Sequence, residues 1–168
     1  FSKNPETAEN VLKILKDCGA DNLSGIAAVS PCARWESKMW PPEFFANALS
    51  MAAEEFPSLD FVLIGSSADS AFCSGIKERS GLKKVHNLAG KTSLKELIEL
   101  IRLSRAMLCV DSGPMHIAAA LGVPVLALFG PTDPLKTGPY GKQHIIFQAK
   151  EGCIKCFKRY CPRVAKDC

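Results

Sequence analysis

The 168-residue chain lacks the features of several large protein classes. It has no run of about eighteen uncharged apolar residues, so the sequence contains no candidate membrane span. It has no strong excess of one charge, because 21 basic residues face 17 acidic ones for a net charge of +4. A nucleic-acid-binding domain usually carries a basic stripe on a folded face. We therefore expect no nucleic-acid partner.

The sequence also lacks internal repeats, a low-complexity segment, the glycine fingerprint of dinucleotide binding and a Walker A loop. Its composition, 47% hydrophobic and 23% charged, is that of one globular domain. The chain begins with Phe1 instead of Met and stops on Cys168, just after a cysteine-rich stretch. We expect it to be a piece of a longer protein.

Short apolar runs alternate with segments of helical periodicity along most of the chain. The runs show no polar alternation, which predicts strands buried on both faces. Strands separated by helices favour βαβ units and a parallel sheet. The predicted strands are 26–29, 61–64, 85–88, 106–110, 123–129 and 144–147. The predicted helices are 6–16, 44–56 and 68–79, a helix capped by Ser93 and Glu96, and a helix that ends at residue 120. The sequence thus predicts an α/β fold with a Rossmann-like, doubly wound parallel sheet.

Three segments of unusual composition follow predicted strands, where loops and helix N-termini of a parallel sheet meet ligands. Segment 30–41 holds Arg34 and Lys38, two cations suited to phosphate. Segment 111–116 places a glycine at a strand-to-helix junction, where the amides of the first helical turn favour an anion. Segment 129–141 is rich in glycine, proline and hydroxyl side chains. Each can also be an ordinary structural loop, and their convergence at one sheet edge favours the ligand site.

These segments carry recognisable motifs. The stretch 109–124 reads CVDSGPMHIAAALGVP and is followed by ALFGPTDP at 127–134. ARWESKMWPPE at 33–43 and NLAG at 87–90 precede them. Together they closely resemble the bacterial heptosyltransferases, lipopolysaccharide core enzymes of glycosyltransferase family 9 that use ADP-heptose. The resemblance implies the C-terminal, donor-binding half of an enzyme with the two-domain GT-B arrangement.

The resemblance also implies roles for individual residues. Lys38 would offset the charge of the diphosphate, and Asp111 would contact the sugar or order its loop; these two are the predicted catalytic residues. Ser112 and the amides that follow it would hold the same phosphates, and residues 88–90 would border the adenine. The family often has an acidic ribose contact after the second strand, for which Asp69 is the candidate here. The predicted binding residues are Arg34, Lys38, Leu88, Ala89, Gly90, Asp111, Ser112, Gly113, Pro114, Met115 and His116.

A cluster of cysteines stands near the C-terminal end, at Cys153, Cys156, Cys161 and Cys168. In a cytosolic type of protein, four thiols at short spacing favour a metal site or reduced thiols over disulfides. Zinc is the default for four thiolates, while two disulfides and, least favoured, an iron–sulfur cluster stay open. The resemblance implies a structural role. Basic residues of the same stretch are typical of a solvated face or of a contact with acidic headgroups of the inner membrane: Lys155, Lys158, Arg159, Arg163 and Lys166.

We therefore expect a nucleotide-sugar-binding domain at 1–150 and a cysteine-rich segment at 151–168. The full-length enzyme would transfer heptose from ADP-heptose to the lipopolysaccharide inner core, in the cytoplasm or peripheral to the inner membrane, with no cofactor required for catalysis. The family's acceptor site and general base lie in its other half, so this piece is expected to bind nucleotide without turnover. The alternatives are a family 9 enzyme for another nucleotide sugar, a non-catalytic nucleotide-binding module, and a small redox or zinc-ribbon protein.

Overall fold

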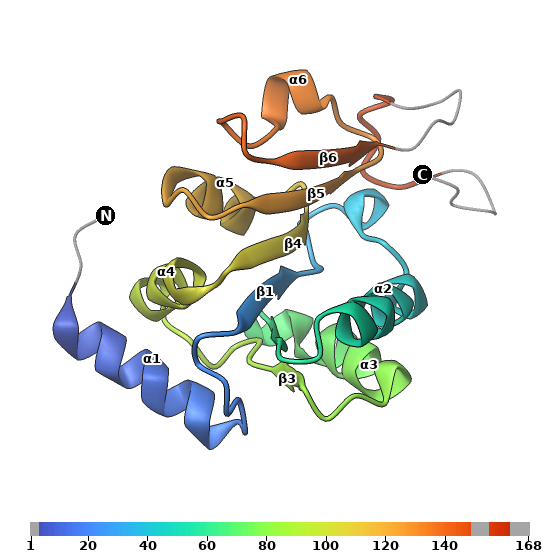
Figure 1. Ribbon diagram of the computed structural model, residues 1–168. Helices are drawn as coiled ribbons and strands as arrows, with labels where there is room; N and C mark the ends of the chain where they lie inside the picture. Colours follow the sequence, from blue (N-terminus) through green and yellow to red (C-terminus); the bar gives the residue numbers. More distant parts are fainter. Residues whose placement is uncertain (1–3, 149–154, 162–168) are drawn as a thin grey trace.

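The computed structural model describes residues 4–148 and 155–161 and contains a six-stranded parallel sheet (Figure 1). The strand order is β3-β2-β1-β4-β5-β6, so the chain moves outward from β1 to β3 and then returns to the other side of β1. This confirms the predicted doubly wound sheet, in which ligands bind where the direction reverses. The strands are β1 (Ile26–Ser30), β2 (Asp60–Leu63), β3 (Val85–Asn87), β4 (Ala106–Val110), β5 (Val125–Phe129) and β6 (Ile145–Gln148).

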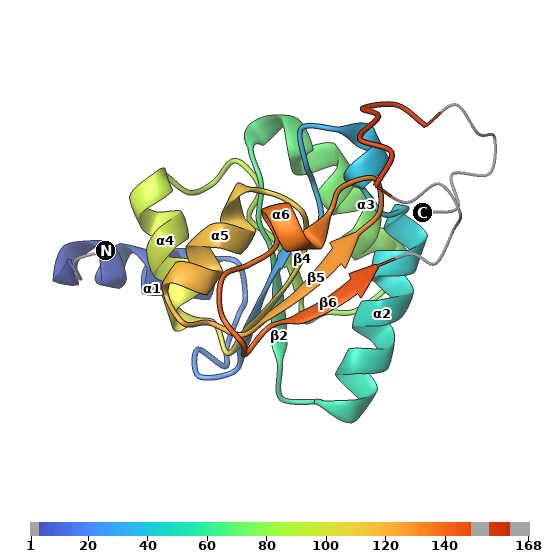
Figure 2. The same ribbon diagram turned by 90° about the horizontal axis from the view of Figure 1, so that it is seen from above.

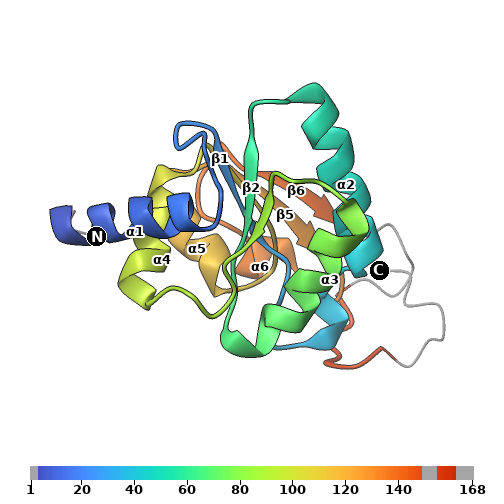
Figure 3. The same ribbon diagram turned by 90° about the horizontal axis from the view of Figure 1, so that it is seen from below.

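Helices cover both faces of the sheet (Figures 2 and 3). On one face α2 packs against α3, and on the other α4 packs against both α1 and α5. Among the described residues, no helix is long and apolar enough to cross a membrane. The α-helices are α1 (Pro5–Asp17), α2 (Pro42–Glu55), α3 (Ser70–Ser80), α4 (Leu94–Leu103), α5 (Gly113–Ala120) and α6 (Pro134–Thr137), and the 3-10 helices are η1 (Glu36–Lys38) and η2 (Ser67–Asp69).

Two hydrophobic cores lie on the two faces of the sheet. One joins the strands to α1, α4 and α5 and includes Leu15, Leu100 and Met107. The other joins them to α2 and α3 and includes Phe45 and Ile76. Because strand residues enter both cores, the strands are apolar without alternation, as the sequence indicated.

The ends of the helices follow local sequence signals. Ser93 and Glu96 form a capping box at the start of α4, in which the Ser93 amide donates to Glu96 Oε2 at 2.8 Å. Gly81 ends α3 in the left-handed conformation with φ of 62°. The predicted helix at 68–79 divides into η2 and α3, and α6 was not predicted because four residues carry no helical periodicity.

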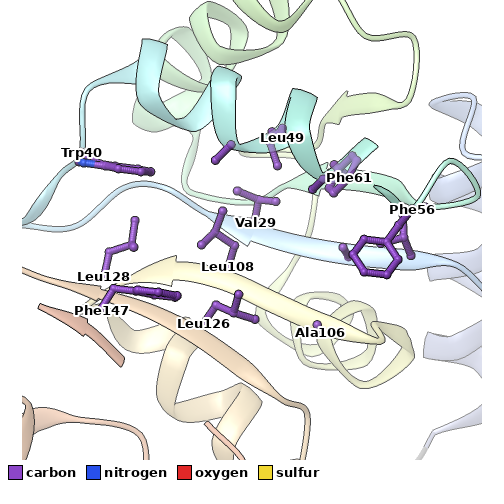
Figure 4. A pocket seen from close by; sticks show the side chains of 14 residues that line it. Val29, Trp40, Leu49, Phe56, Phe61, Ala106, Leu108, Leu126, Leu128 and Phe147 are labelled. Carbon is purple, nitrogen blue, oxygen red and sulfur yellow. The ribbon is translucent and has the colours of Figure 1, made fainter. Parts of the chain in front are cut away.

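Part of the sheet face beside α2 is left open by the described residues. A groove of about 390 Å³ lies there between α2 and strands β1, β4 and β5 (Figure 4). Its walls are apolar: Leu49 comes from α2, Phe56 directly follows that helix, Leu108 comes from β4 and Leu126 from β5, while Phe147 of β6 lies at its margin. The described residues that line the groove include no charged side chain, so the groove does not suit the anion site that the sequence predicts.

Candidate functional site

The carboxyl ends of β1, β4 and β5 bring together a buried carboxylate and three donors. Asp111 directly follows β4 and is 5% exposed. Its Oδ2 accepts from Lys38 Nζ at 2.7 Å, from Thr132 Oγ1 at 2.7 Å and from Thr137 Oγ1 at 3.4 Å. A buried carboxylate is stable only where a cation and hydrogen-bond donors compensate its lost hydration. This cluster meets that requirement.

The sheet order explains why these residues meet. Because β4 lies between β1 and β5, the residue after β4 stands between the loops that follow its two neighbours. Lys38 ends the short helix η1 in the loop after β1, and Thr132 follows β5. Lys38 Nζ also lies 4.8 Å from the centre of the Trp35 ring, a cation–π distance. Lys38 is thus held by its own loop and by Asp111.

The N-terminus of α5 opens beside this cluster. Ser112 is its N-cap, but the Ser112 side chain makes no capping hydrogen bond, and its Oγ is a buried atom without a partner among the described residues. A β-carbon added at Gly113 would meet nothing within 4 Å. An unpaired hydroxyl, open space and the positive end of a helix dipole together make this a suitable place for an anion.

A cleft of about 540 Å³ adjoins the N-terminus of α5 and has the size of a small-molecule site. Four of the predicted binding residues line it: Arg34, Ser112, Gly113 and Pro114. Asp69, the candidate ribose contact, lines it as well. The full lining comprises Ser30, Cys32, Ala33, Arg34, Gly65, Ser66, Asp69, Thr92, Leu94, Leu97, Ser112, Gly113 and Pro114. Arg34 is exposed and lines this cleft.

Other predicted binding residues lie outside this lining. Leu88 and Ala89 are buried at 1% and 4% exposure and pack in the cores. Gly90 is exposed and adopts φ of 77° next to η2. On that side the cleft wall comes from Thr92, Leu94 and Leu97, slightly further along the chain.

Met115 and His116, the last two residues of segment 111–116, have different surroundings. Met115 is fully buried in the core shared by α1, α4 and α5, so its side chain faces away from solvent. Its amide donates to the Ser112 carbonyl at 3.2 Å within the first turn of α5. His116 is exposed. Among the side chains of this motif, Asp111 and Ser112 are therefore the best placed for chemistry.

The two threonines of the cluster were not among the predicted residues. The sequence singled out the segment after β5 for its hydroxyl side chains, without indicating which of them would reach the neighbouring strand. Thr132 is buried at 3% exposure and points at Asp111. Thr137 ends α6, and its Oγ1 also donates to the Asp133 carbonyl at 3.3 Å.

The cleft also contains a thiol that is unsuited to nucleophilic chemistry. A hydrogen bond with the Cys73 side chain, followed by burial, raises the pKa of Cys32 well above its usual value. Cys32 therefore stays a neutral thiol at physiological pH. Asp69, nearby, accepts from the amide and the hydroxyl of Ser66, both at 2.7 Å.

The cysteine cluster is only partly described. Cys156 and Cys161 are free thiols, exposed and half-buried respectively. Cys153 and Cys168 lie outside the described residues. Within 4–148 and 155–161, no three His, Cys, Asp or Glu side chains are grouped as metal ligands. The predicted four-cysteine site stays a prediction.

Comparisons with known proteins show similarity to one family and to its solved structures. A family described as glycosyltransferase family 9 (heptosyltransferase) matches residues 6–166. Lipooligosaccharide heptosyltransferase 2 of Haemophilus ducreyi is 37% identical over 154 residues, which are 88% of this chain and 43% of that protein. The structure of ADP-heptose lipopolysaccharide heptosyltransferase II from E. coli is similar with a TM-score of 0.74 and 26% identity, over 88% of this chain and 44% of the other. E. coli heptosyltransferase WaaC with ADP has a TM-score of 0.69 and 24% identity, over 84% and 42%. The chain spans less than half the length of these relatives.

Proposed function

Because the chain belongs to glycosyltransferase family 9, we propose that it is the half of a heptosyltransferase that binds the nucleotide sugar. In this proposal it holds ADP-heptose, and the full-length protein transfers the heptose to the lipopolysaccharide inner core. The observation that carries the proposal is the placement of Lys38, Asp111 and the open N-terminus of α5 at one edge of the sheet. Relatives with ADP or ADP-heptose in their names support the choice of nucleotide.

The diphosphate would lie between Lys38 and the start of α5. Lys38 supplies a positive charge, and the Gly113 amide and the Ser112 hydroxyl supply hydrogen-bond donors. In the reaction an acceptor hydroxyl attacks the anomeric carbon and gives its proton to a general base, the bond from that carbon to the phosphate oxygen breaks, and ADP leaves with the electron pair. Donors fixed before the reaction stabilise the charge that develops on the leaving phosphate.

Asp111 would have two functions in this site. Its Oδ2 orients the Lys38 ammonium and binds the Thr132 hydroxyl. The carboxylate also lies at the same edge as the proposed phosphate site, where it can accept from a sugar hydroxyl. Asp69 is the proposed acceptor for the ribose hydroxyls, since it lines the cleft on the side of η2.

The general base and the acceptor site are proposed to lie in the part of the relatives that this chain does not cover. We therefore expect nucleotide binding without turnover from residues 1–168. The same test distinguishes two alternatives. A family 9 enzyme for another nucleotide sugar would prefer a nucleotide with another nucleobase, and a non-catalytic module would bind nucleotide independently of Lys38. The cytoplasmic location, the inner-membrane contact and a structural zinc at the cysteine cluster stay predictions.

The test is calorimetric titration with ADP, UDP and GDP, for the wild-type chain and for Lys38→Ala. We expect a preference for ADP and a loss of affinity of about ten- to a hundredfold in Lys38→Ala, the range for a hydrogen bond to a charged group. Lys13→Ala is the control, because Lys13 is an exposed cation of α1 and its loss changes the net charge equally.

Two results would reject parts of the proposal. A preference for UDP would retain the glycosyltransferase and exclude ADP-heptose. Unchanged ADP affinity in Lys38→Ala would favour the non-catalytic module. Because Lys38→Ala leaves Asp111 without its cation, Arg34→Ala is measured in parallel; Arg34 is exposed and lines the cleft, so its loss tests the phosphate site without disturbing Asp111.

A further inference from the structure

A segment near the end of the chain lies against the loop that carries Lys38. We call residues 155–161 the strap and residues 31–41 the Lys38 loop; the two run side by side in Figure 2, in red and blue. The Ser37 hydroxyl donates to the Lys158 carbonyl at 2.6 Å, and the Ser37 amide donates to the Arg159 carbonyl at 3.3 Å. Ser37 thus makes two bonds to the strap from the position next to Lys38.

Arg159 adds a side-chain contact to these bonds. Its guanidinium carbon lies 5.6 Å from the centre of the Trp35 ring, the same ring that lies 4.8 Å from Lys38 Nζ. Both distances are within the range of cation–π attraction. One indole therefore contacts a cation of the strap and the cation proposed to bind phosphate.

The strap also contacts the loop on the other side of Asp111. We call residues 130–138 the Thr132 loop. The Phe157 amide donates to the Pro131 carbonyl at 2.9 Å. Lys155 Nζ lies 3.1 Å from Asp133 Oδ1, and this ion pair lowers the pKa of the Asp133 carboxyl. The same Asp133 oxygen caps α6 by accepting from the Leu135 amide at 3.2 Å.

The strap therefore contacts two loops that follow different strands, β1 and β5. One presents Lys38 and the other presents Thr132, and both side chains bind Asp111 Oδ2. Fixing a long side chain and its loop costs conformational entropy. When the side chain and its loop are already ordered in the free protein, ligand binding does not have to order them, and the affinity is higher.

We infer that the strap positions the donor-binding site, and that Ser37 is the positioning residue through which it holds Lys38 on Asp111. The expected effect of the strap on nucleotide affinity rests on the proposed function. The effect of the strap on the position of Lys38 does not, because Lys38 pairs with Asp111 in the chain without a ligand.

The first test therefore needs no nucleotide. Acetic anhydride acylates a lysine only as the deprotonated amine, with acetate as the leaving group. The acylation rate of each lysine, measured by mass spectrometry, therefore rises when the side chain leaves its partner and can lose its proton. We expect Lys38 to react about fivefold faster in Ser37→Ala than in wild type, the factor that corresponds to one lost hydrogen bond. Lys13 is the internal reference and should not change. Ser37→Thr keeps the hydroxyl and should restore the wild-type rate.

The second test measures ADP affinity in a double-mutant cycle of Ser37→Ala and Lys38→Ala. Ser37→Ala should weaken ADP binding about fivefold in the wild-type background. It should have no further effect in the Lys38→Ala background, because Ser37 acts through Lys38. A general loss of structure would instead weaken binding equally in both backgrounds. Ser80→Ala is the matched control: its hydroxyl donates to the Lys77 carbonyl at 2.8 Å at the far end of α3.

The outcomes separate the two proposals. An unchanged acylation rate of Lys38 in Ser37→Ala, or an equal loss of ADP affinity in both backgrounds, overturns the positioning role. Absence of ADP binding by the wild-type chain refutes the proposed function, and the acylation rates then decide the positioning role alone. Thermal unfolding of each variant checks that the fold is intact. If Ser37→Ala is unstable, Ser37→Cys provides a second variant, because it keeps a side chain of similar size and replaces the hydroxyl with a much weaker donor.

Discussion

At the scale of single residues, two glycines near the cleft have opposite surroundings. A β-carbon at Gly113 would meet nothing within 4 Å, whereas one at Gly90 would come within 2.7 Å of the Ser67 α-carbon. Gly90 also has φ of 77°, which disfavours any other residue. Gly90 is therefore required by the fold. The absence of a side chain at Gly113 has no such structural reason and is compatible with the proposed approach of a phosphate to the backbone.

The variant Gly113→Ala tests whether the glycine is required by the fold or by ligand binding. The free energy of unfolding should stay within about 1 kcal/mol of wild type, since alanine is the better helix former. ADP affinity should fall by about tenfold or more, because the methyl group occupies the place proposed for the phosphates. Calorimetry and thermal melting provide the two measurements. Gly90→Ala should show the reverse pattern, with a clear loss of stability; normal ADP affinity in Gly113→Ala would place the phosphates elsewhere.

At the scale of elements, a buried ion pair joins β2, β3 and the end of α1, away from the cleft. His86 Nε2 lies 2.7 Å from Asp60 Oδ1, and His86 Nδ1 lies 3.0 Å from the Cys18 carbonyl. A hydrogen bond with the Cys18 side chain, followed by one with Asp60, raises the pKa of His86 to about 9 against the opposing effect of burial. Parallel pairing of Val62 with His86 brings these residues together.

This pair should make stability depend on pH. Because the folded-state pKa of His86 is above its value of about 6.5 in the unfolded chain, the stabilisation is complete below about pH 6.5. It is lost as the pH rises through about 9. The melting temperature should therefore decrease as the pH rises from about 6.5 to about 9. The difference in melting temperature between wild type and His86→Gln should shrink over the same pH interval. A constant difference across the interval would contradict the pair's contribution.

At the scale of the whole molecule, the two faces of the sheet are covered unequally by the described residues. The groove beside α2 exposes the apolar faces of β4 and β5, and Phe147 at its margin is 52% exposed. A continuous apolar surface of this kind binds hydrophobic dyes.

Anilinonaphthalene sulfonate should therefore fluoresce in the presence of the native chain. The variant Phe147→Ser should reduce this signal while costing about 1 kcal/mol of stability, as expected for a half-buried aromatic side chain. Tyr140→Ser is the control, because Tyr140 is 93% exposed and lies outside the groove. Equal fluorescence from Phe147→Ser and wild type would show that the dye binds elsewhere.

The sequence predicted the sheet and the cleft edge better than the contacts within them. Periodicity identifies strands and helices because burial repeats locally. Lys38 and Asp111 were identified by the composition of the segments that follow the predicted strands and by the family resemblance. Thr132 and Thr137 were missed, because which hydroxyl reaches Asp111 depends on the spacing between β4 and β5. The role of Ser37 was missed for the same kind of reason, since its partners are supplied by a distant part of the chain.

The contact between Ser37 and Lys158 spans 121 positions of sequence, which has a consequence for biosynthesis. A ribosome adds about 5–20 residues per second, so the Lys38 loop is made roughly 6–24 seconds before the strap. During that interval all six strands can emerge and pair, while the Lys38 loop lacks the contacts that hold it. The edge proposed to bind phosphate is therefore completed last, and under the proposed function a nascent chain would bind nucleotide at full affinity only after its sheet has formed.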